Sequence, residues 1–366
     1  MAAPVVANAV RWPAEWERQD AVWIGWPHHE PDWPGKFGPI PWVYAEIVRA
    51  LAPYQRVEIL CHSDAVMAEA RECLTLHGVD EARYRLHLEP TDRVWLRDSG
   101  ATAVHRADGS VALVRWGFNA WAKYDNHAHD ARVGAFVGAH TGLAVDQPMR
   151  HDGAGRVILE GGGIETDGRG TILVTEEWLL TDVQVRNPGF TRADYERTFA
   201  ETLGCTRTIW LGEGCVGDDT HGHVDDIARF VAPGVLVLAH EEDPADENHA
   251  RSADNLRRLA GATDARGEPI RVVTLPYPRA VVMDGTRLPA SYANFYIANG
   301  VVLMPTFNDP NDRVALNTLA ELMPDRQVVG IHAVDLVWGL GTLHCLTQQQ
   351  PAAKGRRGAG AGQAHG

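Results

Sequence analysis

The stretch Ala232-Pro233-Gly234-Val235-Leu236-Val237-Leu238 joins a tight turn to an apolar strand, and the same pairing recurs along the chain. We expect the other strands of this kind at 21–24, 111–114, 171–174 and 301–304. All but the first follow a turn, at 107–109, 167–170, 232–234 and 298–300. Because such turns connect extended segments into β-hairpins, the sequence predicts four hairpins within five similar units.

A helix and a second apolar strand follow each of these strands. We expect helices at 43–51, 131–137, 193–203, 253–259 and 315–322, and closing strands at 57–61, 143–145, 208–211, 270–275 and 327–331. The third helix has the clearest ends, because Thr191 with Asp194 forms an N-terminal cap pattern and Gly204 is a typical C-terminal stop. This repetition suggests a closed or stacked α/β repeat, although an open α/β sheet shows the same alternation.

The placement of the reactive side chains favours a closed repeat, in which the five units form a ring, over an open sheet. They lie in the segments before successive hairpins: Asp98, Glu160, His223 with Asp225, and Asn294. Cys345 follows the last closing strand. Equivalent positions in a ring of units meet near its axis, so we expect these residues to converge there.

Composition limits the classes of function. The chain has 366 residues, 45% of them hydrophobic, and a formal net charge of −14. This charge argues against nucleic acid as a partner and is compatible with a small cationic substrate. No apolar run reaches the ~20 residues of a membrane span, and residues 1–8 lack the features of a signal peptide. The five cysteines show no paired spacing, so we expect reduced thiols and a cytoplasmic location.

Cys345 is the candidate nucleophile. It lies in a glycine-flanked polar turn, whereas the other four cysteines lie in or beside strands, helices and a loop. A thiol needs a base or a positive field to become reactive. If residues 223–225 are extended, His223 and Asp225 point to the same face and supply a proton carrier beside an anion.

This grouping suits a guanidinium substrate. Carboxylates around a thiol oppose thiolate formation unless a cation lies between them, and Asp98 and Asp225 can each accept two hydrogen bonds from a planar guanidinium. Attack by Cys345 on the guanidinium carbon, with His223 protonating the departing ammonia, leaves a covalent intermediate that water hydrolyses. We expect Glu160 to orient His223 and keep it protonated.

Several phrases, in order along residues 12–351, closely resemble the agmatine deiminase family, which includes bacterial peptidylarginine deiminases. They are Trp12-Pro13-Ala14-Glu15-Trp16-Glu17, Trp95-Leu96-Arg97-Asp98-Ser99-Gly100, Trp116-Gly117-Phe118-Asn119-Ala120-Trp121, Glu160-Gly161-Gly162-Gly163, Gly222-His223-Val224-Asp225, Tyr292-Ala293-Asn294-Phe295-Tyr296 and Gly341-Thr342-Leu343-His344-Cys345. The resemblance implies the α/β pentein fold, a five-bladed pseudo-fivefold propeller. It also implies hydrolysis of agmatine to N-carbamoylputrescine and ammonia without metal or organic cofactor.

The resemblance assigns roles to matching positions. It implies that Cys345 is the nucleophile, His223 the general acid and base, Asp98 and Asp225 the guanidinium-binding carboxylates, and Glu160 a supporting residue. We further expect four residues to contact the substrate: Trp95, Trp121, Asn294 and Gly341. The chain departs from the family pattern at Ala101 and Trp178. We expect the loops around these residues to shape the part of the pocket that holds the substrate tail. Peptidylarginine or another guanidine therefore remains an alternative substrate.

Two other classes of function stay open from the residues alone. His221, His223 and Asp225 would share one face of an extended segment, which suits zinc or manganese in a metal-dependent amidohydrolase. A non-catalytic repeat protein that binds a cation through its acidic centre is the other alternative. We expect one catalytic domain over residues 10–351, a flexible tail over 352–366, and, from aromatic loops at Trp33 and Trp42, a possible homodimer.

Overall fold

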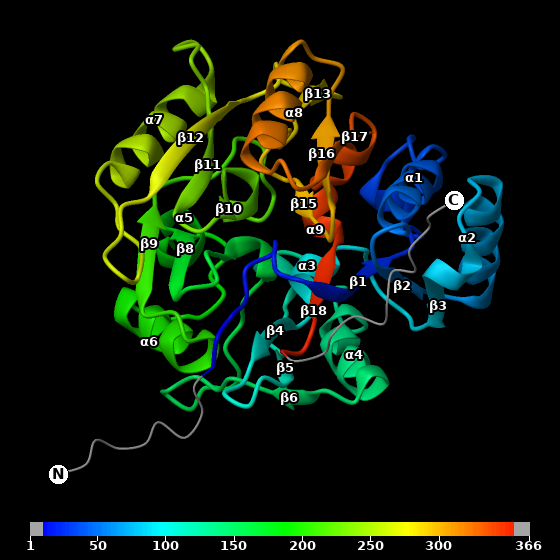
Figure 1. The fold of residues 1–366 in the computed structure, drawn as a ribbon, viewed down its shortest axis with the longest axis horizontal. Coiled ribbons are helices and arrows are strands. Elements are labelled where there is room, and N and C mark those ends of the chain that lie inside the picture. Colours follow the sequence, from blue (N-terminus) through cyan, green and yellow to red (C-terminus); the bar gives the residue numbers. More distant parts are fainter. Residues whose placement is uncertain (1–9, 355–366) are drawn as a thin grey trace, which may run out of the picture.

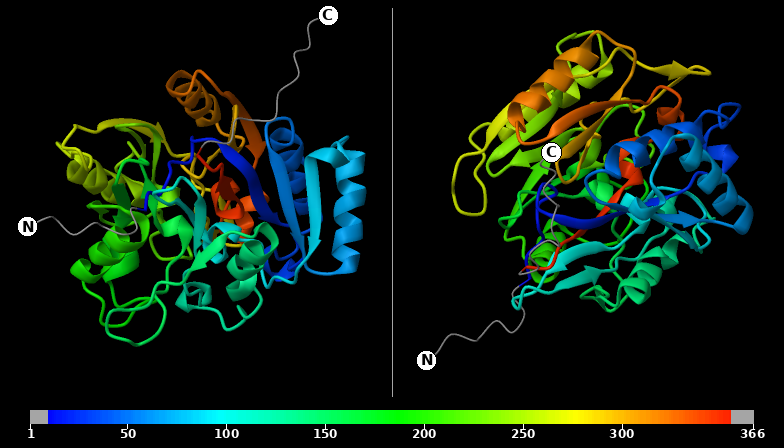
Figure 2. Two further views of the ribbon diagram at one scale, coloured as in Figure 1. Left: turned by 60° about the horizontal axis from the view of Figure 1, so that its bottom comes forward. Right: turned by 45° about the vertical axis from the view of Figure 1, so that its right-hand side comes forward.

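The structure, a computed structural model, describes residues 10–354. Five β-sheets surround a common centre, and a helix packs on the outer side of each (Figure 1). The two rotated views show the same ring (Figure 2). The five-bladed α/β propeller that the family resemblance implied is confirmed, and the repeated units form a closed ring.

Four blades share one strand order. In each, the first strand is antiparallel to the second, and the second is parallel to the third. Their strands are β4 (Thr102–His105), β5 (Val111–Val114) and β6 (Ala144–Asp146); β7 (Glu165–Thr166), β8 (Thr171–Thr175) and β9 (Arg207–Leu211); β10 (Ala228–Ala232), β11 (Val235–His240) and β12 (Arg271–Pro276); and β15 (Tyr296–Ile297), β16 (Val301–Thr306) and β17 (Gln327–His332). The four predicted hairpins are therefore confirmed.

The remaining blade joins the two ends of the described chain. β1 (Gln19–Gly25) is parallel to β2 (Arg56–Cys61), which is parallel to β3 (Tyr84–Leu88). The strand antiparallel to β1 is β18 (Gln348–Pro351), which lies almost 300 residues after β2. This pairing explains why the first unit had no hairpin turn in the sequence. It also closes the ring, because no blade is left without its antiparallel strand.

One helix connects the second and third strands of each blade, as parallel strands require. These helices are α1 (Ile40–Leu51), α4 (Val133–Thr141), α6 (Arg192–Leu203), α7 (Glu247–Leu259) and α8 (Asn311–Leu322). All five overlap the predicted ranges. In α6 the side chain of Thr191 accepts from the backbone of Asp194 in a capping box, and Gly204 ends the helix with a φ of 70°.

Some elements were not predicted. α2 (Asp64–Leu76) begins at Ser63, whose hydroxyl accepts from the backbone of Val66. Together with β3 it enlarges the first blade. The other unpredicted elements are α5 (Glu176–Leu180), a small hairpin of β13 (Val282–Met283) and β14 (Thr286–Arg287), and the short 3-10 helices η1 (Glu30–Asp32), η2 (Glu81–Arg83), η3 (Ala120–Ala122), η4 (Asp130–Arg132) and η7 (Leu336–Gly339).

Short helical turns surround the axis of the ring. Each lies immediately before the first strand of a blade: α3 (Leu96–Ser99), η5 (Gly161–Gly163), η6 (Val224–Asp226) and α9 (Leu343–Leu346). Figure 1 shows α3 and α9 at the centre. We expected extended segments before the hairpins and a polar turn at Cys345. A helical turn instead allows consecutive side chains to point into the same central space.

Two further expectations differ from the structure. Ala352, the first residue of the predicted tail, donates through its backbone to Arg18, and Lys354 donates to Gly109, so residues 352–354 pack on the fold. The rest of the predicted tail, 355–366, lies outside the described residues. Trp33 is fully buried and donates to the carbonyl of Leu336, whereas Trp42 is 61% exposed.

Within residues 10–354, the helices are too short or too polar to cross a membrane.

Candidate active site

The central turns bring the predicted catalytic side chains together. Asp98 lies on α3, Glu160 directly precedes η5, Asp225 lies on η6 and Cys345 on α9. His223 directly precedes η6. All five side chains are buried, and they come from four different blades. The predicted convergence at the axis is therefore observed.

The sulfur of Cys345 lies among acidic groups. It is 3.6 Å from Oδ2 of Asp225, and Nδ2 of Asn294 lies 3.1 Å from it on another side. Burial and the nearby charges of Asp225, Asp226 and Asp98 raise the pKa of the Cys345 thiol well above its usual value. This environment favours the neutral thiol over the thiolate.

Asn294 holds the loop that carries the nucleophile. Its Oδ1 accepts from the hydroxyl of Thr342 at 2.8 Å and from the backbone N–H of His344 at 3.0 Å. Its Nδ2 donates to Asp226 at 3.0 Å as well as to the sulfur. Asn294 is fully buried beneath the pocket, so the structure assigns it contacts with Cys345, and its contact with substrate stays a prediction.

His223 lies between two carboxylates. Its Nε2 is 3.3 Å from Oε2 of Glu160, and its Nδ1 is 3.8 Å from Oδ1 of Asp98. Burial lowers the pKa of His223, but the charges of Asp98 and Glu160 outweigh it and raise the pKa to about 9. Its Nδ1 has no hydrogen-bond partner within residues 10–354, so an imidazolium proton is available to a bound molecule.

Glu160 is held as an anion behind His223. Arg186 donates to its Oε1 at 3.1 Å, and the indole of Trp178 donates to its Oε2 at 2.8 Å. Burial raises its pKa, but Arg186 and His223 more than compensate and lower it to about 2. The sequence analysis did not identify Arg186, because a single arginine between the third blade's strands carries no distinctive motif.

Asp98 is fixed by two donors. The indole of Trp121 donates to Oδ2 at 2.8 Å, and the backbone of Gly162 donates to Oδ1 at 2.9 Å. Burial, with the nearby charges of Asp225 and Glu160, raises the pKa of Asp98 to about 6. Asp98 is therefore ionised near neutral pH and can bind a cation.

Gly162 faces the catalytic groups directly. A Cβ atom at this position would lie 2.7 Å from Nδ1 of His223, 2.8 Å from Oδ1 of Asp98 and 3.1 Å from Oδ2 of Asp225. These distances show that the three side chains share one small space. They also explain why a glycine is required here.

A network of buried charged side chains contacts Asp225 through His344. Nδ1 of His344 lies 2.7 Å from Oδ2 of Asp225, and Nε2 of His344 lies 2.8 Å from Oε2 of Glu15. Glu15 also accepts from Arg229 at 2.8 Å and from Arg97 at 3.0 Å. Although burial opposes ionisation, His344 lowers the pKa of Asp225 below its usual value.

This network was missed from the sequence. Glu15 and His344 lie within two of the phrases that carry the family resemblance, but nothing in their local pattern indicated a role. The two residues are 329 positions apart, and only closure of the ring brings them into contact.

A pocket of about 390 Å³ leads to Cys345. Trp95, Trp121 and Gly341 line it, and their contact with substrate stays a prediction. The pocket is also lined by Asp32, Arg93, Tyr124, Asp219, Trp338 and Leu340. Arg93 donates to Asp32 at 3.2 Å and stacks over the ring of Tyr124 at 4.3 Å. Aromatic walls and carboxylates suit a slender organic cation.

The described residues do not place His221, His223 and Asp225 as the set of metal ligands that the sequence allowed. His221 has a positive φ of 65° and its Nε2 lies 3.0 Å from the hydroxyl of Thr181. Residues 224–226 form η6 rather than an extended strand. Among the described residues, His221 is therefore not grouped with His223 and Asp225 as a set of metal ligands.

Comparisons with known proteins agree with this geometry. Residues 11–351 match the profile of the Porphyromonas-type peptidyl-arginine deiminase family. The chain belongs to this family. A relative from Streptomyces avermitilis is 36% identical over 94% of this chain and 98% of its own length. The agmatine deiminase of Pseudomonas aeruginosa is 33% identical over 95% of this chain and 97% of its own.

A solved structure of a family member shows the same architecture. The agmatine deiminase of Enterococcus faecalis superposes with a TM-score of 0.86 at 29% identity, covering 96% of this chain and 99% of its own. The family resemblance and the pentein fold expected from the sequence are therefore confirmed. The individual roles of the site residues stay predictions that the geometry supports.

Proposed function

We propose that this deiminase-family protein hydrolyses agmatine to N-carbamoylputrescine and ammonia through a covalent intermediate on Cys345. The observation that carries the proposal is the thiol of Cys345 3.6 Å from Asp225, in the pocket that Asp98 also lines, with His223, whose pKa is raised to about 9, close to both carboxylates. Relatives named agmatine deiminase, matched over nearly the whole chain, support the choice of substrate.

Substrate binding activates the nucleophile. The guanidinium group brings a positive charge between carboxylates that otherwise keep Cys345 protonated. Asp98 and Asp225 accept its N–H groups and hold its carbon above the sulfur. Because the added charge stabilises a thiolate, the thiol releases its proton to solvent when substrate is bound rather than before.

The chemical steps use the proton on His223. The sulfur of Cys345 bonds to the guanidinium carbon, and the imidazolium of His223 transfers its proton to one terminal nitrogen, which leaves as ammonia. An S-alkylthiouronium remains on the enzyme. Neutral His223 then takes one proton from water as the water oxygen bonds to the same carbon. The carbon–sulfur bond breaks, and the remaining hydroxyl proton passes to the sulfur, which restores the thiol of Cys345 and releases the ureido product.

The outer pocket favours a substrate without a carboxylate. Three aspartates, Asp32, Asp98 and Asp219, line the pocket with a single arginine, Arg93. Arg93 is paired with Asp32, so it is not free to bind a substrate carboxylate. Agmatine has an ammonium group where arginine has a charged amino-acid end, and this favours agmatine over free arginine. A peptidyl arginine, which carries no carboxylate at that residue, remains the second candidate.

The test is ammonia release from agmatine, free arginine and an arginine-containing peptide under identical conditions. We expect the highest kcat/KM for agmatine, complete loss of turnover in Cys345→Ser, and an unchanged rate in Cys73→Ser, whose cysteine lies on α2 away from the site. Mass spectrometry of the quenched enzyme should find the adduct on Cys345. Preference for the peptide would identify a peptidylarginine deiminase, and residual turnover in Cys345→Ser would refute the thiol mechanism.

We also propose that the protein is cytoplasmic. All five cysteines lie in the described part of the chain, are buried and carry free thiols, which suits a reducing compartment.

The possible homodimer stays a prediction. Of the two tryptophans that suggested it, only Trp42 is exposed.

A further inference from the structure

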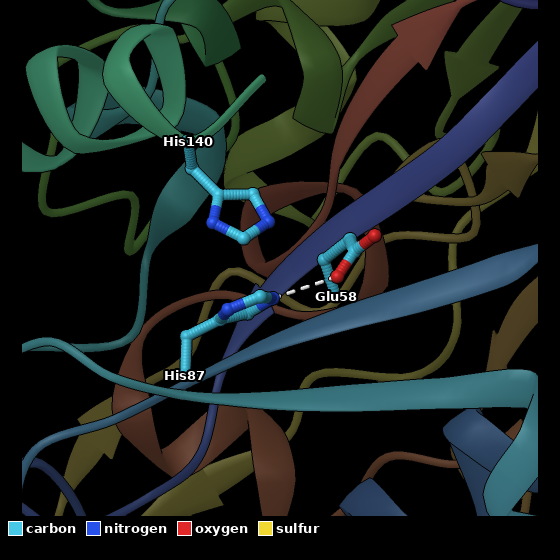
Figure 3. Close-up of side chains that lie close together, drawn as sticks. All are labelled: Glu58, His87 and His140. Atoms are coloured by element: carbon cyan, nitrogen blue, oxygen red, sulfur yellow. Dashed lines mark hydrogen bonds and ion pairs between the residues drawn. The ribbon is translucent and has the colours of Figure 1, made fainter. Parts of the chain in front are cut away.

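Glu58, His87 and His140 converge where the first two blades meet (Figure 3), and none of them lines the pocket at Cys345. Glu58 lies on β2 and His87 on β3 of the first blade, while His140 lies on α4 of the second. One ligand-type atom from each lies within 4.8 Å of the others. We propose that these residues form a binding site for one divalent transition-metal ion of the zinc class, which links the two blades.

The strand pattern explains why these side chains share a face. On β2, Val57 and Ile59 pack in the main hydrophobic core, so Glu58 between them points to the opposite face of the sheet. That face packs against α4, as Trp23 of β1 and Val137 of α4 show by their common hydrophobic cluster. A carboxylate that is buried beside this cluster needs a specific partner.

The carboxylate of Glu58 is almost completely buried, at 1% exposure. Its Oε1 contacts Nε of Arg56, and its Oε2 lies 2.7 Å from Nε2 of His87. These two contacts hold the carboxylate in place, with Oε2 turned toward the imidazole of His87. Arg56 orients the carboxylate in the way that outer-shell partners orient metal ligands.

Aromatic contacts restrain the two imidazoles. Trp23 stacks on His87 with 5.4 Å between ring centroids, and Phe136 stacks on His140 at 5.8 Å. The rings of His87 and His140 are 4.4 Å apart. His140 also lies in the last turn of α4, where the helix dipole favours a positive charge. The ligands are therefore held close together before an ion arrives.

Two imidazoles and one carboxylate are a ligand set that suits zinc and its neighbours in the first transition row. His140 is exposed, so an ion can enter from solvent and keep water at the remaining coordination positions. On binding, any proton shared by His87 Nε2 and Glu58 Oε2 is released to solvent, and both atoms bind the metal instead. The ion joins α4 to the first blade, and α4 contacts α3, which carries Asp98.

The test is zinc titration of the full-length protein by isothermal calorimetry. It is done in a Cys345→Ser background, because the thiol with Asp225 and Asp226 forms another group of close ligand atoms. We expect one equivalent to bind and the thermal unfolding midpoint to rise. Since loss of an outer-shell partner alone costs about 10–100-fold in metal affinity, His140→Ala should weaken binding at least about tenfold.

His332→Ala, which removes an exposed histidine from β17 in another blade, is the matched control and should bind zinc unchanged. Glu58→Gln keeps the size of the side chain and should also weaken binding. X-ray absorption should find nitrogen and oxygen ligands at about 2.0–2.1 Å and no sulfur. Equal affinities in His140→Ala and His332→Ala, or no saturable binding, would show that Glu58 and His87 form only a hydrogen-bonded pair.

Discussion

The side-chain amide of Asn294 donates to the sulfur of Cys345 over 3.1 Å. The same side chain accepts from Thr342 and His344, which flank the nucleophile in sequence. Asn294 precedes β15 and Cys345 precedes β18, so two blades of the ring are joined at the reactive atom. The amide therefore positions Cys345 and is the only neutral donor that the described residues direct at its sulfur.

Asn294→Asp should make the thiol of Cys345 less reactive, although the Asn and Asp side chains have nearly the same shape. A carboxylate cannot donate to the sulfur, and its charge adds to those of Asp225 and Asp226, so the pKa of the thiol rises further. We expect alkylation of Cys345 by iodoacetamide to require a higher pH and kcat to fall at least tenfold. Asn299→Asp, at a turn away from the sulfur, is the control. Alkylation profiles that coincide would contradict the role given to Asn294.

Gly162→Ala should reduce activity without unfolding the protein. The added methyl group would occupy the space shared by His223, Asp98 and Asp225 and displace a bound guanidinium. We expect kcat/KM to fall by at least about two orders of magnitude, as small displacements of reacting groups can cost 10²-fold. Gly38→Ala, where a Cβ meets nothing within 4 Å, should retain full activity. An active Gly162→Ala enzyme would mean that the substrate does not bind in this space.

The pH dependence of kcat/KM should be bell-shaped. Asp98 must be ionised to bind the cation and its pKa is about 6, so activity should rise as pH increases through this value. His223 must be protonated to release ammonia and its pKa is about 9, so activity should fall as pH increases through that value. Steady-state rates from pH 5 to 10 test this, and a profile without an alkaline limb would exclude His223 as the acid.

Glu160→Gln should shift the alkaline limb of the kcat/KM pH profile. Glu160 is one of the charges that raise the pKa of His223, so its neutralisation lowers that pKa and shifts the limb to lower pH. The acidic limb should move little. Glu201→Gln, which neutralises an exposed carboxylate on α6, should leave both limbs in place. An unchanged alkaline limb in Glu160→Gln would show that another group sets it.

Glu15→Gln should destabilise the protein strongly. It leaves Arg229 and Arg97 without their shared anion in the interior, and breaking a buried ion pair costs about 3–5 kcal/mol. Glu17→Gln disrupts a pair with Arg11 whose side chains are 31% exposed, and the expected loss is within about 1 kcal/mol. Urea unfolding of both variants measures the difference. Equal losses would show that the Glu15 network is not a main source of stability.

Much of the fold was predictable from local sequence. The five helices, the five closing strands and four hairpins follow from apolar periodicity and turn residues, which act over short distances. The candidate nucleophile and its carboxylates were also predictable. Cysteine, histidine and aspartate in distinctive phrases indicate chemistry by their type, and their equivalent places in the units indicated convergence.

The helical turns around the axis were not predictable by this reasoning. Val224–Asp226 and Leu343–Leu346 are too short for a periodic pattern to distinguish a turn from a strand. The positions of Trp33 and of residues 352–354 depend on packing partners elsewhere in the ring. Local sequence contains no information about those partners.

The amino-acid sequence by itself determined the repeated unit, the family and the reacting groups, because these depend on residue type and short-range pattern. Only the tertiary structure decided how they are held. The pairing of β18 with β1 brings His344 to Glu15, and the charges that raise the pKa of His223 come from Asp98 and Glu160 in other blades. Electrostatic energy and burial depend on distances through space, and these exist only once the ring is closed.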